Sequence, residues 1–567
     1  MKTIFRTILS VLLVLTVSCG KKQEKFPVYT ISVDREAITD VAANNPGMEA
    51  LVITTDAPYW IVAAPDWVKP DVTHGVGGGK SSILILTIAS NYKNEATTTK
   101  ARKGEIKISG GRSSVSVSIS QLGHEAVIDP SASIGGIPSL EEFKDFVEAV
   151  NNGDAPIRWM NQNFEVELLA DLDLSSITEW TPIGAIGNSG NTNNNTKPKN
   201  GNTFTGVFNG GGHTIRNFNV TTTLTDGQTW GLFGYIDNAT IKNLNVEANL
   251  NISSTINSDA SVSAGTDVGV VVGTARCSTI ENVKVTAKIT SAGTTSAKRF
   301  AVGGIVGFVF SVFDSGEQAA YDSWIKDCEV TAEVTMDGGS NLANGAAGAM
   351  YGGIAGFSTN IKDASRNHIV NCVNNGTMTV KLGRCSGICP TANYGTIMEG
   401  CTNNADQVNT IVGGRVGQIC CNLSENSSLK DCVNNGNLTT TDSGTTTAAL
   451  VALVGQDTAS IEGGERVANT GIIIGANTKY LSLLVANTTK CEYVKNLKLA
   501  GKLGVYKADG NHEMYPVNES NIMQYVGSIA AAYADKFSNI TFVGEATATP
   551  SKDGGITDLD PVNDSWN

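Results

Sequence analysis

Ile325-Lys326-Asp327-Cys328, Ile369-Val370-Asn371-Cys372, Met398-Glu399-Gly400-Cys401 and Leu429-Lys430-Asp431-Cys432 are copies of one four-residue line of sequence. Related copies stand at 215–218, 241–244, 280–283 and 494–497. A glycine-bounded apolar line precedes most copies, at 231–234, 269–273, 303–307, 352–356 and 453–455, and a third line carries paired asparagines, at 374–376, 403–404 and 434–436. An internal repeat therefore dominates residues 160–505.

Each repeat unit is too short to bury its own apolar side, so neighbouring units must stack. Stacked parallel strands place equivalent residues above one another, about 4.8 Å apart. The paired asparagines suit corners that need a positive φ, and their stacked side chains can hydrogen-bond to one another. The pattern predicts a right-handed parallel β-helix of about eight to ten coils, on the order of 40–50 Å long. One inward-facing ladder should contain Phe218, Leu244, Val283, Cys328, Cys372, Cys401 and Cys432.

An amphipathic helix is predicted directly before the repeats. Ser139 followed by Glu142 is a capping box, and Asn151-Asn152-Gly153 is typical of a helix end. Apolar residues recur between them at helical spacing. Such a helix needs a surface to cover, and the open end of the β-helix provides one. The apolar set is Leu140, Phe143, Phe146, Val147 and Val150.

Residues 29–123 have a different pattern. Short stretches with alternating apolar residues, such as 30–33, 50–55, 82–88 and 115–119, are separated by turn residues. This pattern predicts an antiparallel, immunoglobulin-like β-sandwich of about 90 residues. The whole chain is therefore expected to be all-β, a sandwich followed by a parallel β-helix with a helical N-terminal cap.

The sandwich sequence resembles the BACON domain of Bacteroidetes. The resemblance rests on the Trp60 strand, the Pro65-Asp66-Trp67-Val68 turn, the glycines of 75–79, the 102–106 segment and the closing 117–123 strand. It implies a carbohydrate-binding role in which Trp60 and Trp67 stack on sugars. The residues themselves favour the other reading, a spacer domain whose tryptophans belong to the core, because a sandwich core normally buries one or two tryptophans.

The start of the repeat region resembles the GLUG-motif β-helix proteins, which are secreted and surface proteins of bacteria. The matching stretches are 168–174, 180–184, 204–215 and 231–234. The resemblance implies that Asp171, Asp173 and His213 are structural residues of corners and turns.

The N-terminus has the features of an export signal. Lys2 and Arg6 precede a short apolar run, 8–17, which is too short to cross a bilayer. The run ends in Thr16-Val17-Ser18-Cys19-Gly20, which resembles a bacterial lipobox with threonine where leucine is usual. We expect Cys19 to be the lipid attachment site of an outer-membrane protein, facing either the cell surface or the periplasm. An ordinary secretory signal is the alternative.

The sequence thus divides into six segments. They are a lipoprotein signal peptide (1–18), a tether (19–28), the sandwich (29–123), a linker (124–138), the capping helix with the β-helix (139–505) and a C-terminal cap with a loose tail (506–567). A helix is predicted at 522–537. Loss of Lys2 and Arg6 takes the formal charge from −13 to −15, which argues against nucleic acid as a partner.

The eleven cysteines raise the question of disulfides. The ladder cysteines are expected to be small buried hydrophobes, while Cys385 and Cys389 form the favoured candidate bridge because they lie close together. Zinc bound by these two with Cys420 and Cys421 has non-standard spacing, so no metal and no cofactor are predicted.

No set of catalytic residues stands out. The five histidines are scattered, and the charged cluster of Asp322, Lys326, Asp327 and Glu329 fits a solvated face better than the rim of an active site. The sequence therefore favours a non-catalytic envelope protein that binds a glycan or a host-surface ligand along its β-helix. The candidate ligand-binding aromatic residues are Trp60, Trp67, Trp230, Trp324, Tyr351 and Tyr394. A polysaccharide lyase or glycoside hydrolase, and a purely structural spacer, are the alternatives.

Overall fold

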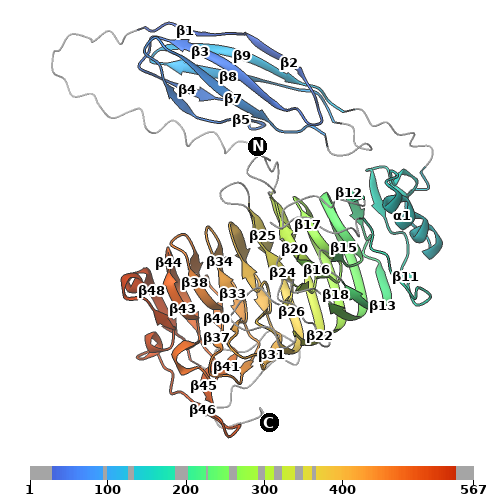
Figure 1. The fold of residues 1–567 in the computed structure, drawn as a ribbon, viewed down its shortest axis with the longest axis vertical. Helices are drawn as coiled ribbons and strands as arrows, with labels where there is room; N and C mark the ends of the chain where they lie inside the picture. The colour runs from blue at the N-terminus through green and yellow to red at the C-terminus, as the bar shows by residue number, and fades with distance from the viewer. Residues whose placement is uncertain are drawn as a thin grey trace, which may run out of the picture. The chain divides into compact units, whose positions relative to one another are not determined.

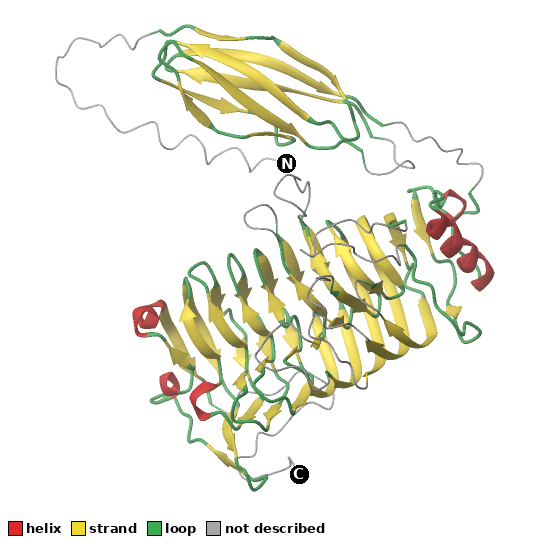
Figure 2. Cartoon of the chain, viewed as in Figure 1, coloured by secondary structure: helices red, strands yellow, loops and turns green. Residues whose placement is uncertain are grey.

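A computed structural model describes residues 28–92, 99–124, 133–184, 202–224, 228–254, 265–291, 300–311, 322–338, 349–360 and 366–544. Cys19, the expected signal peptide and the polar tail after 544 lie outside the described residues. The chain divides into two compact units, and the main division along the sequence falls between residues 125 and 126. Almost all regular structure is strand, so the predicted all-β fold class is confirmed (Figure 2).

The first unit is a β-sandwich. Its two sheets enclose a core with Trp60, Leu51, Leu84, Ile106 and Val117. Neighbouring strands pair antiparallel except β2 and β9, which are parallel. One sheet contains β1 (Ile31–Val33), β3 (Met48–Thr55), β7 (Ser81–Ile88) and β5 (Val68–Pro70); the other contains β2 (Ala37–Val41), β9 (Ser113–Gln121), β8 (Arg102–Gly110), β4 (Tyr59–Ala63) and β6 (His74–Val76).

The second unit is a parallel β-helix whose strands lie in stacked rows from β11 and β13 to β44 and β48 (Figure 1). The first coils contain β10 (Glu165–Glu167), β11 (Leu172–Asp173), β12 (Phe204–Asn209), β13 (Thr214–Leu224), β15 (Phe233–Ser254) and β18 (Thr279–Ser291). A separate eight-stranded sheet forms one side and contains β14 (Thr229–Trp230), β16 (Thr266–Gly269), β19 (Phe300–Gly303), β23 (Ala349–Gly352), β27 (Arg384–Ser386), β32 (Arg415–Gly417), β37 (Thr446–Ala448) and β42 (Leu481–Ser482).

Three further rows complete the coils. The first contains β17 (Val272–Arg276), β20 (Val306–Phe310), β24 (Ala355–Ser358), β28 (Thr391–Ala392), β33 (Cys420–Leu423), β38 (Val451–Gly455), β43 (Val485–Lys490) and β47 (Ser528–Ile529). The second contains β21 (Ser323–Lys326), β25 (Asn367–Val370), β29 (Thr396–Glu399), β34 (Ser428–Lys430), β39 (Ser460–Glu462), β44 (Tyr493–Leu499) and β48 (Phe537–Phe542). The third contains β22 (Glu329–Asp337), β26 (Val373–Lys381), β30 (Thr402–Asn403), β31 (Asp406–Asn409), β35 (Val433–Asn434), β36 (Leu438–Thr440), β40 (Val467–Asn469), β41 (Ile472–Gly475) and β45 (Lys502–Tyr506), which β46 (His512–Met514) joins in antiparallel pairing.

Helix α1 (Leu140–Asn152) covers the N-terminal end of the β-helix, as its amphipathic pattern predicts (Figure 1). Its N-cap is Ser139, whose Oγ accepts a hydrogen bond from the Glu142 amide, and its C-cap is Gly153 at φ 87°. Phe143, Phe146 and Val150 are buried in the β-helix core. The Phe146 ring packs 5.9 Å from that of Phe208 in the first coil, so the helix closes the open end of the core.

The inward-facing ladder follows the predicted order from Leu244 onward. Leu244 is in register with Val283. On the later coils Glu329, Val373, Thr402 and Val433 are in register with one another. Each of these four follows a ladder cysteine, so the cysteines stack as well. Phe218 is also buried, but a register irregularity in β13 pairs it with Ala248, so it stands outside this ladder.

Stacked asparagines run parallel to the cysteine ladder. Asn374 donates to Asn403 (2.8 Å), Asn403 to Asn434 (2.9 Å) and Asn434 to Asn469 (2.8 Å), and all four are buried. The predicted bonding between stacked asparagines is therefore present. Each side-chain amide hydrogen-bonds to the next one along the coil axis, and these bonds offset the free-energy cost of burying the amides.

The left-handed corner lies at a different position from the predicted one. The third residue of the four-residue line has a positive φ in all eight copies, as at Asn243 (53°), Asn282 (51°) and Asp327 (53°). Asn and Asp tolerate this conformation better than other residues with a side chain. In the paired-asparagine line only the glycine of 374–376 has a positive φ (108°), because the asparagines belong to strand β26.

The helix predicted at 522–537 is wrong. Two short 3-10 turns, η4 (Ile522–Gln524) and η5 (Ala531–Lys536), stand on either side of β47, and Phe537 begins β48. β48 pairs in parallel with β44, so coil stacking continues beyond residue 505. The backbone groups of this segment bond to the preceding coil, which outweighs the helical preference of three consecutive alanines. Two further 3-10 turns are η2 (Ile157–Trp159) and η3 (Thr478–Tyr480).

The described part of the chain contains no helix of the length and apolarity that a bilayer crossing requires.

The cap offers a test through Glu142. Its carboxylate accepts hydrogen bonds from Arg158 (2.6 Å) and Trp159 Nε1 (2.7 Å), which lower its pKa from 4.5 to about 2. A lowered folded-state pKa gives stability that is present above pH 4.5 and is lost as the pH falls toward 2. We expect Glu142→Gln to lower the melting temperature at pH 7 and the difference to shrink as the pH approaches 2. A constant difference across this range would contradict the assignment.

The asparagine chain offers a second test. Asn403→Leu removes the acceptor of Asn374 Nδ2 and the donor to Asn434 Oδ1, at a cost of about 1–3 kcal/mol for each buried group left unsatisfied. We expect a clear fall in the denaturant midpoint. The control is Asn404→Ala, because Asn404 is only half-buried and its partners Asn375 and Asn435 can bond to water or other neighbours. Equal effects of the two variants would contradict the ladder's role.

Candidate functional site

Three of the six candidate aromatic residues are buried and cannot contact a ligand. Trp60 is 1% exposed and lies against Gly75, where an added Cβ would come within 2.3 Å of the indole. Trp230 stacks on Phe218 in the β-helix core. Tyr351 is fully buried, and burial raises the pKa of its phenol. The prediction that these three side chains bind ligand is therefore wrong, because alternation in their strands turns them inward.

Trp67, Trp324 and Tyr394 reach solvent, but the two tryptophans have covered ring faces. The Arg102 guanidinium lies 4.6 Å from the Trp67 ring centre. Trp324 is 36% exposed, and His368 on the next coil stacks on it at 3.7 Å with the planes 4° apart. Its other face is turned toward the coil of Thr279, with which it is in register. Trp324 therefore presents its edge to solvent, which suits sugar stacking poorly.

The charged cluster near Trp324 is engaged in cross-coil contacts. Lys326 lies 2.6 Å from Glu281, and Glu329 lies 3.6 Å from Lys284. Asp322 accepts hydrogen bonds from the Arg366 amide and from His368. These contacts support the interpretation of a solvated structural face.

Asp171, Asp173 and His213 also have structural partners. Asp171 accepts hydrogen bonds from the Thr214 amide (2.9 Å) and from His213 (3.3 Å). Asp173 accepts one from Asn217, and these bonds hold the pKa of both aspartates below their usual range. These residues tie adjacent coils together.

The candidate bridge between Cys385 and Cys389 does not form, since all ten described cysteines are free and buried. The Cys385 thiol contacts Met378 Sδ (3.9 Å), whereas the Cys389 thiol donates to the Thr391 carbonyl, so the two side chains are directed to different neighbours. No group of metal-binding side chains occurs among the described residues. Burial raises the pKa of Cys385, and that of Cys389 and Cys421 to about 12.

The buried thiols make a measurable prediction. Because the ten described thiols are buried, a maleimide cannot reach them in the folded protein, which should therefore react very slowly at pH 8. Unfolding in guanidinium without reductant should expose all ten as free thiols. Mass spectrometry counts the labels. A lower count after unfolding, reproduced under acid quench, would mean that disulfides form.

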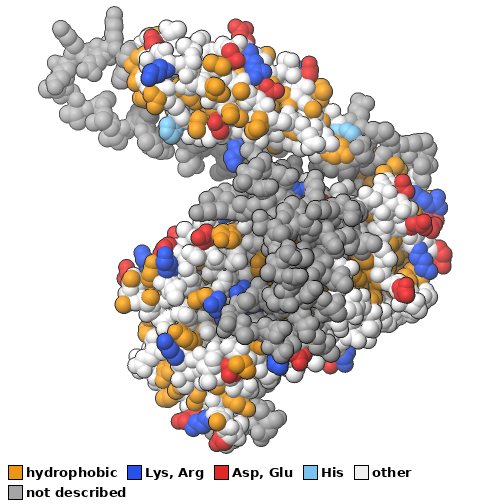
Figure 3. Space-filling model, in the orientation of Figure 1, with side chains coloured by type: hydrophobic (Ala, Val, Ile, Leu, Met, Phe, Trp, Pro, Cys, Tyr) orange, Lys and Arg blue, Asp and Glu red, His pale blue; other side chains and the backbone are white. Residues whose placement is uncertain are grey.

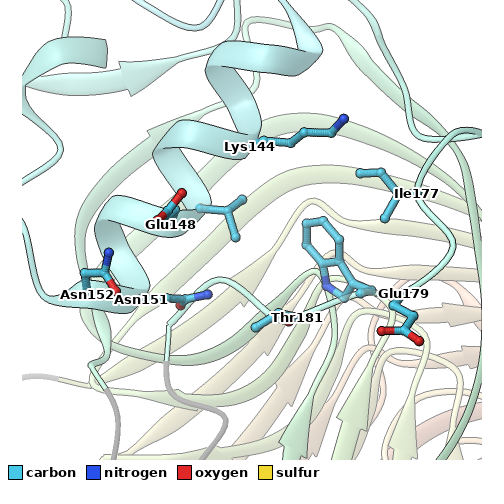
Figure 4. Close-up of a pocket in the computed structure, with 9 residues that line it drawn as sticks. Lys144, Glu148, Asn151, Asn152, Ile177, Glu179 and Thr181 are labelled. Carbon is cyan, nitrogen blue, oxygen red and sulfur yellow. The ribbon is translucent and has the colours of Figure 1, made fainter.

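The structure instead provides a pocket of about 410 Å³ between α1 and the loop before β12 (Figure 4). Glu148 and Asn152 project from α1, and Glu179 and Thr181 come from the facing loop. The indole of Trp180 lines it as well. Together the lining residues are Lys144, Val147, Glu148, Asn151, Asn152, Ile177, Glu179, Trp180 and Thr181.

The walls of this pocket are fixed in place. Trp180 Nε1 donates to the Gly231 carbonyl (2.8 Å), and its ring is nearly parallel to that of Phe143, at 12°. Asn151 holds the loop to the helix, because its Nδ2 donates to the Pro182 carbonyl (3.1 Å) and its Oδ1 accepts from the Gly184 amide (2.9 Å). The pocket is therefore pre-formed, as small-molecule sites usually are.

The chemistry of the lining is mixed. An indole, Val147 and Ile177 supply apolar surface, while amides, a hydroxyl, one ammonium and two carboxylates supply hydrogen-bonding groups. Sequence reasoning missed this site because Trp180 belongs to a repeat motif. The available signal was the helical spacing of Lys144, Glu148 and Asn152, which places them on the helix face opposite Phe143 and Phe146.

No protein-family model and no curated protein matches the chain. Among solved structures, it is similar to a putative immunoglobulin A1 protease from Bacteroides ovatus, with 16% identity and a TM-score of 0.29 over 67% of this chain and 78% of that one. An IgA1 protease matches with 11% identity and a TM-score of 0.34 over 89% of this chain and 33% of that one. A GH5 xyloglucanase from Bacteroides ovatus, in complex with a heptasaccharide, matches with 13% identity and a TM-score of 0.14 over 39% of this chain and 46% of that one. These similarities assign no function.

Proposed function

We propose that the protein is a non-catalytic, lipid-anchored envelope protein that binds glycan. The observation that carries this proposal is the pocket lined by Trp180. Sugar rings combine an apolar face with a rim of hydroxyl groups, and this pocket combines an aromatic ring and aliphatic side chains with carboxylates and amides.

The net charge of the lining residues limits the class of ligand that the pocket can bind. One ammonium, Lys144, stands with two carboxylates, Glu148 and Glu179, so the pocket has a net negative charge. Such a pocket disfavours an anionic ligand and suits a neutral sugar residue, whose hydroxyl groups can donate to the carboxylates. The anchor at Cys19 and an outer-membrane location belong to the same proposal, and they rest on the sequence of the N-terminus.

A glycoside hydrolase is the second candidate, because two carboxylates from opposite walls line one pocket (Figure 4). Paired carboxylates are the usual machinery of glycoside hydrolysis. Against this candidate, Glu148 and Glu179 are both exposed to solvent, whereas the general acid of a glycoside hydrolase usually lies in a desolvated site.

We expect Glu148→Gln and Glu179→Gln each to weaken binding to the best ligand of a neutral-glycan panel by about tenfold or more, because a hydrogen bond to a charged group contributes ~1.5–3 kcal/mol. Trp180→Phe should weaken binding while it keeps the packing against Phe143. Isothermal titration calorimetry measures the affinities. The matched control is Trp324→Ala, which removes an exposed indole outside the pocket and should leave binding unchanged.

The outcomes separate the candidates. Binding that falls with Trp324→Ala but not with the pocket variants would move the site to the β-helix face. If the protein releases new reducing ends from any panel polysaccharide, and Glu148→Gln abolishes this release, the result would support the hydrolase instead of the non-catalytic binding protein. No binding across the panel by folded protein would contradict the proposal.

A further inference from the structure

Exposed apolar side chains are unevenly distributed between the two units. Of the sixteen large apolar side chains that are exposed in the described part of the chain, ten belong to the sandwich, although it is much the smaller unit. Hydrophobic side chains are spread over the visible face of the sandwich in Figure 3. Single exposed apolar residues are normal on any protein surface, whereas a group of them at one place indicates an interaction surface.

Four of these ten side chains lie together at one end of the sandwich. Tyr59 and Val76 are direct cross-strand partners on β4 and β6. Ser82 Oγ donates to the Val76 carbonyl (3.1 Å), so the start of β7, which also carries Ile83, lies beside them. We call the four residues the apolar tip: Val28 (80% exposed), Tyr59 (61%), Val76 (77%) and Ile83 (66%).

Hydrogen bonds between turns place Val28 at the same end. The Gly78 amide donates to the Ala57 carbonyl (2.7 Å), which joins the turn between β6 and β7 to the turn between β3 and β4. The Thr30 amide donates to Asp56 Oδ1 (2.7 Å), which fixes the segment that follows Val28 to the second of these turns. The apolar tip is therefore the end at which the chain enters the sandwich.

The length of chain before Val28 limits how far this end can be from a membrane. Only eight residues separate Val28 from Cys19, the lipid attachment site of the proposed function. Fully extended, this connection spans at most about 30 Å, which is close to the length of the sandwich itself, because the eight residues of β3 span about 26 Å. A surface held so near to an anchored lipid meets the bilayer at a high effective concentration, so even weak contacts can keep it docked.

The residues of the apolar tip suit the interface of a bilayer. Val28, Val76 and Ile83 supply aliphatic side chains, and Tyr59 is of the type that lies at the level of lipid headgroups, with its ring covered and its hydroxyl in water. Lys80, in the turn after Val76, is an exposed cation that can lie against lipid phosphates. Aliphatic side chains with an aromatic residue and a cation at their border are typical of proteins that dock on membranes.

We propose that the apolar tip docks the sandwich end-on against the bilayer to which Cys19 is anchored, with the headgroup region and the upper acyl chains of the lipids as its partner. The proposal rests on the lipid anchor that the proposed function includes. It adds a second, non-covalent contact with the membrane, which holds the sandwich upright where a tether alone would let it rotate freely. The Trp180 pocket takes no part in this contact.

The test is hydrogen–deuterium exchange of the chain from Cys19 onward, coupled through Cys19 to a maleimide lipid in vesicles of phosphatidylethanolamine and phosphatidylglycerol. Coupling is selective because the other ten cysteines are buried. It also supplies the anchor directly, so the result does not depend on lipidation in the cell. We expect amide exchange in the turns 55–58 and 77–80 to be several-fold slower than in the same chain without vesicles, because the docked bilayer excludes water from them.

Two matched variants locate the contact. Val76→Gln should lower the ratio of docked to free sandwich about tenfold, because burial of a valine side chain in the bilayer is lost. Met48→Gln is the control, since Met48 is 70% exposed but begins β3, at the opposite end of that strand from Thr55 and the tip. It should leave the protection of both turns unchanged. Both positions are exposed, so circular dichroism should show both variants folded.

Three results would overturn the proposal. They are unchanged exchange in the turns of the coupled chain, an equal loss of protection in Val76→Gln and Met48→Gln, and protection that appears without vesicles as the protein concentration rises, which would assign the tip to a second copy of the chain.

The intact mass of protein extracted from its native membrane tests the anchor separately. A lipidated Cys19 in a chain whose turns stay unprotected would remove the docking contact and keep the anchor. If the coupled chain docks while the native protein carries no lipid, the membrane affinity of the tip stands and the anchor of the proposed function falls.

Discussion

In-register stacking of parallel strands is the constraint on which the rest of this structure depends. Each side chain of a coil has a neighbour directly above and below it, about 4.8 Å away. Whatever occupies a row must tolerate its own repetition. Apolar residues do so by forming a continuous core, amides by donating to the next amide as in Asn374, Asn403 and Asn434, and charges by alternating in sign as in Glu399, Lys430 and Glu462.

The same constraint limits where binding can occur. A side chain within a row makes its interactions with its two neighbours along the coil axis. Trp324 illustrates the consequence, because His368 covers one face of its ring and only the edge is open. Ligand-binding chemistry is therefore expected where the rows stop, and the pocket at the capping helix meets this condition.

Much of the architecture can be predicted from the sequence, because the repeated residues indicate which strands stack on one another. The cysteine ladder, the bonded asparagines and the cap from Ser139 to Gly153 could all be predicted from spacing. The 522–537 segment could not, since its short-range preference is helical and only pairing with β44 makes Phe537–Phe542 a strand. The register shift that removes Phe218 from the ladder likewise depends on tertiary packing.

The sites were harder to predict for a related reason. Aromatic residues in a β-rich sequence are typical of sugar-binding surfaces, yet Trp60, Trp230 and Tyr351 face inward from their strands. Trp180 belongs to a repeat motif, so the sequence suggested only a structural role for it. Its place in the pocket depends on α1, which comes from a different part of the chain. A stacked fold thus reveals its core in the sequence, while its sites arise from contacts that break the repeat.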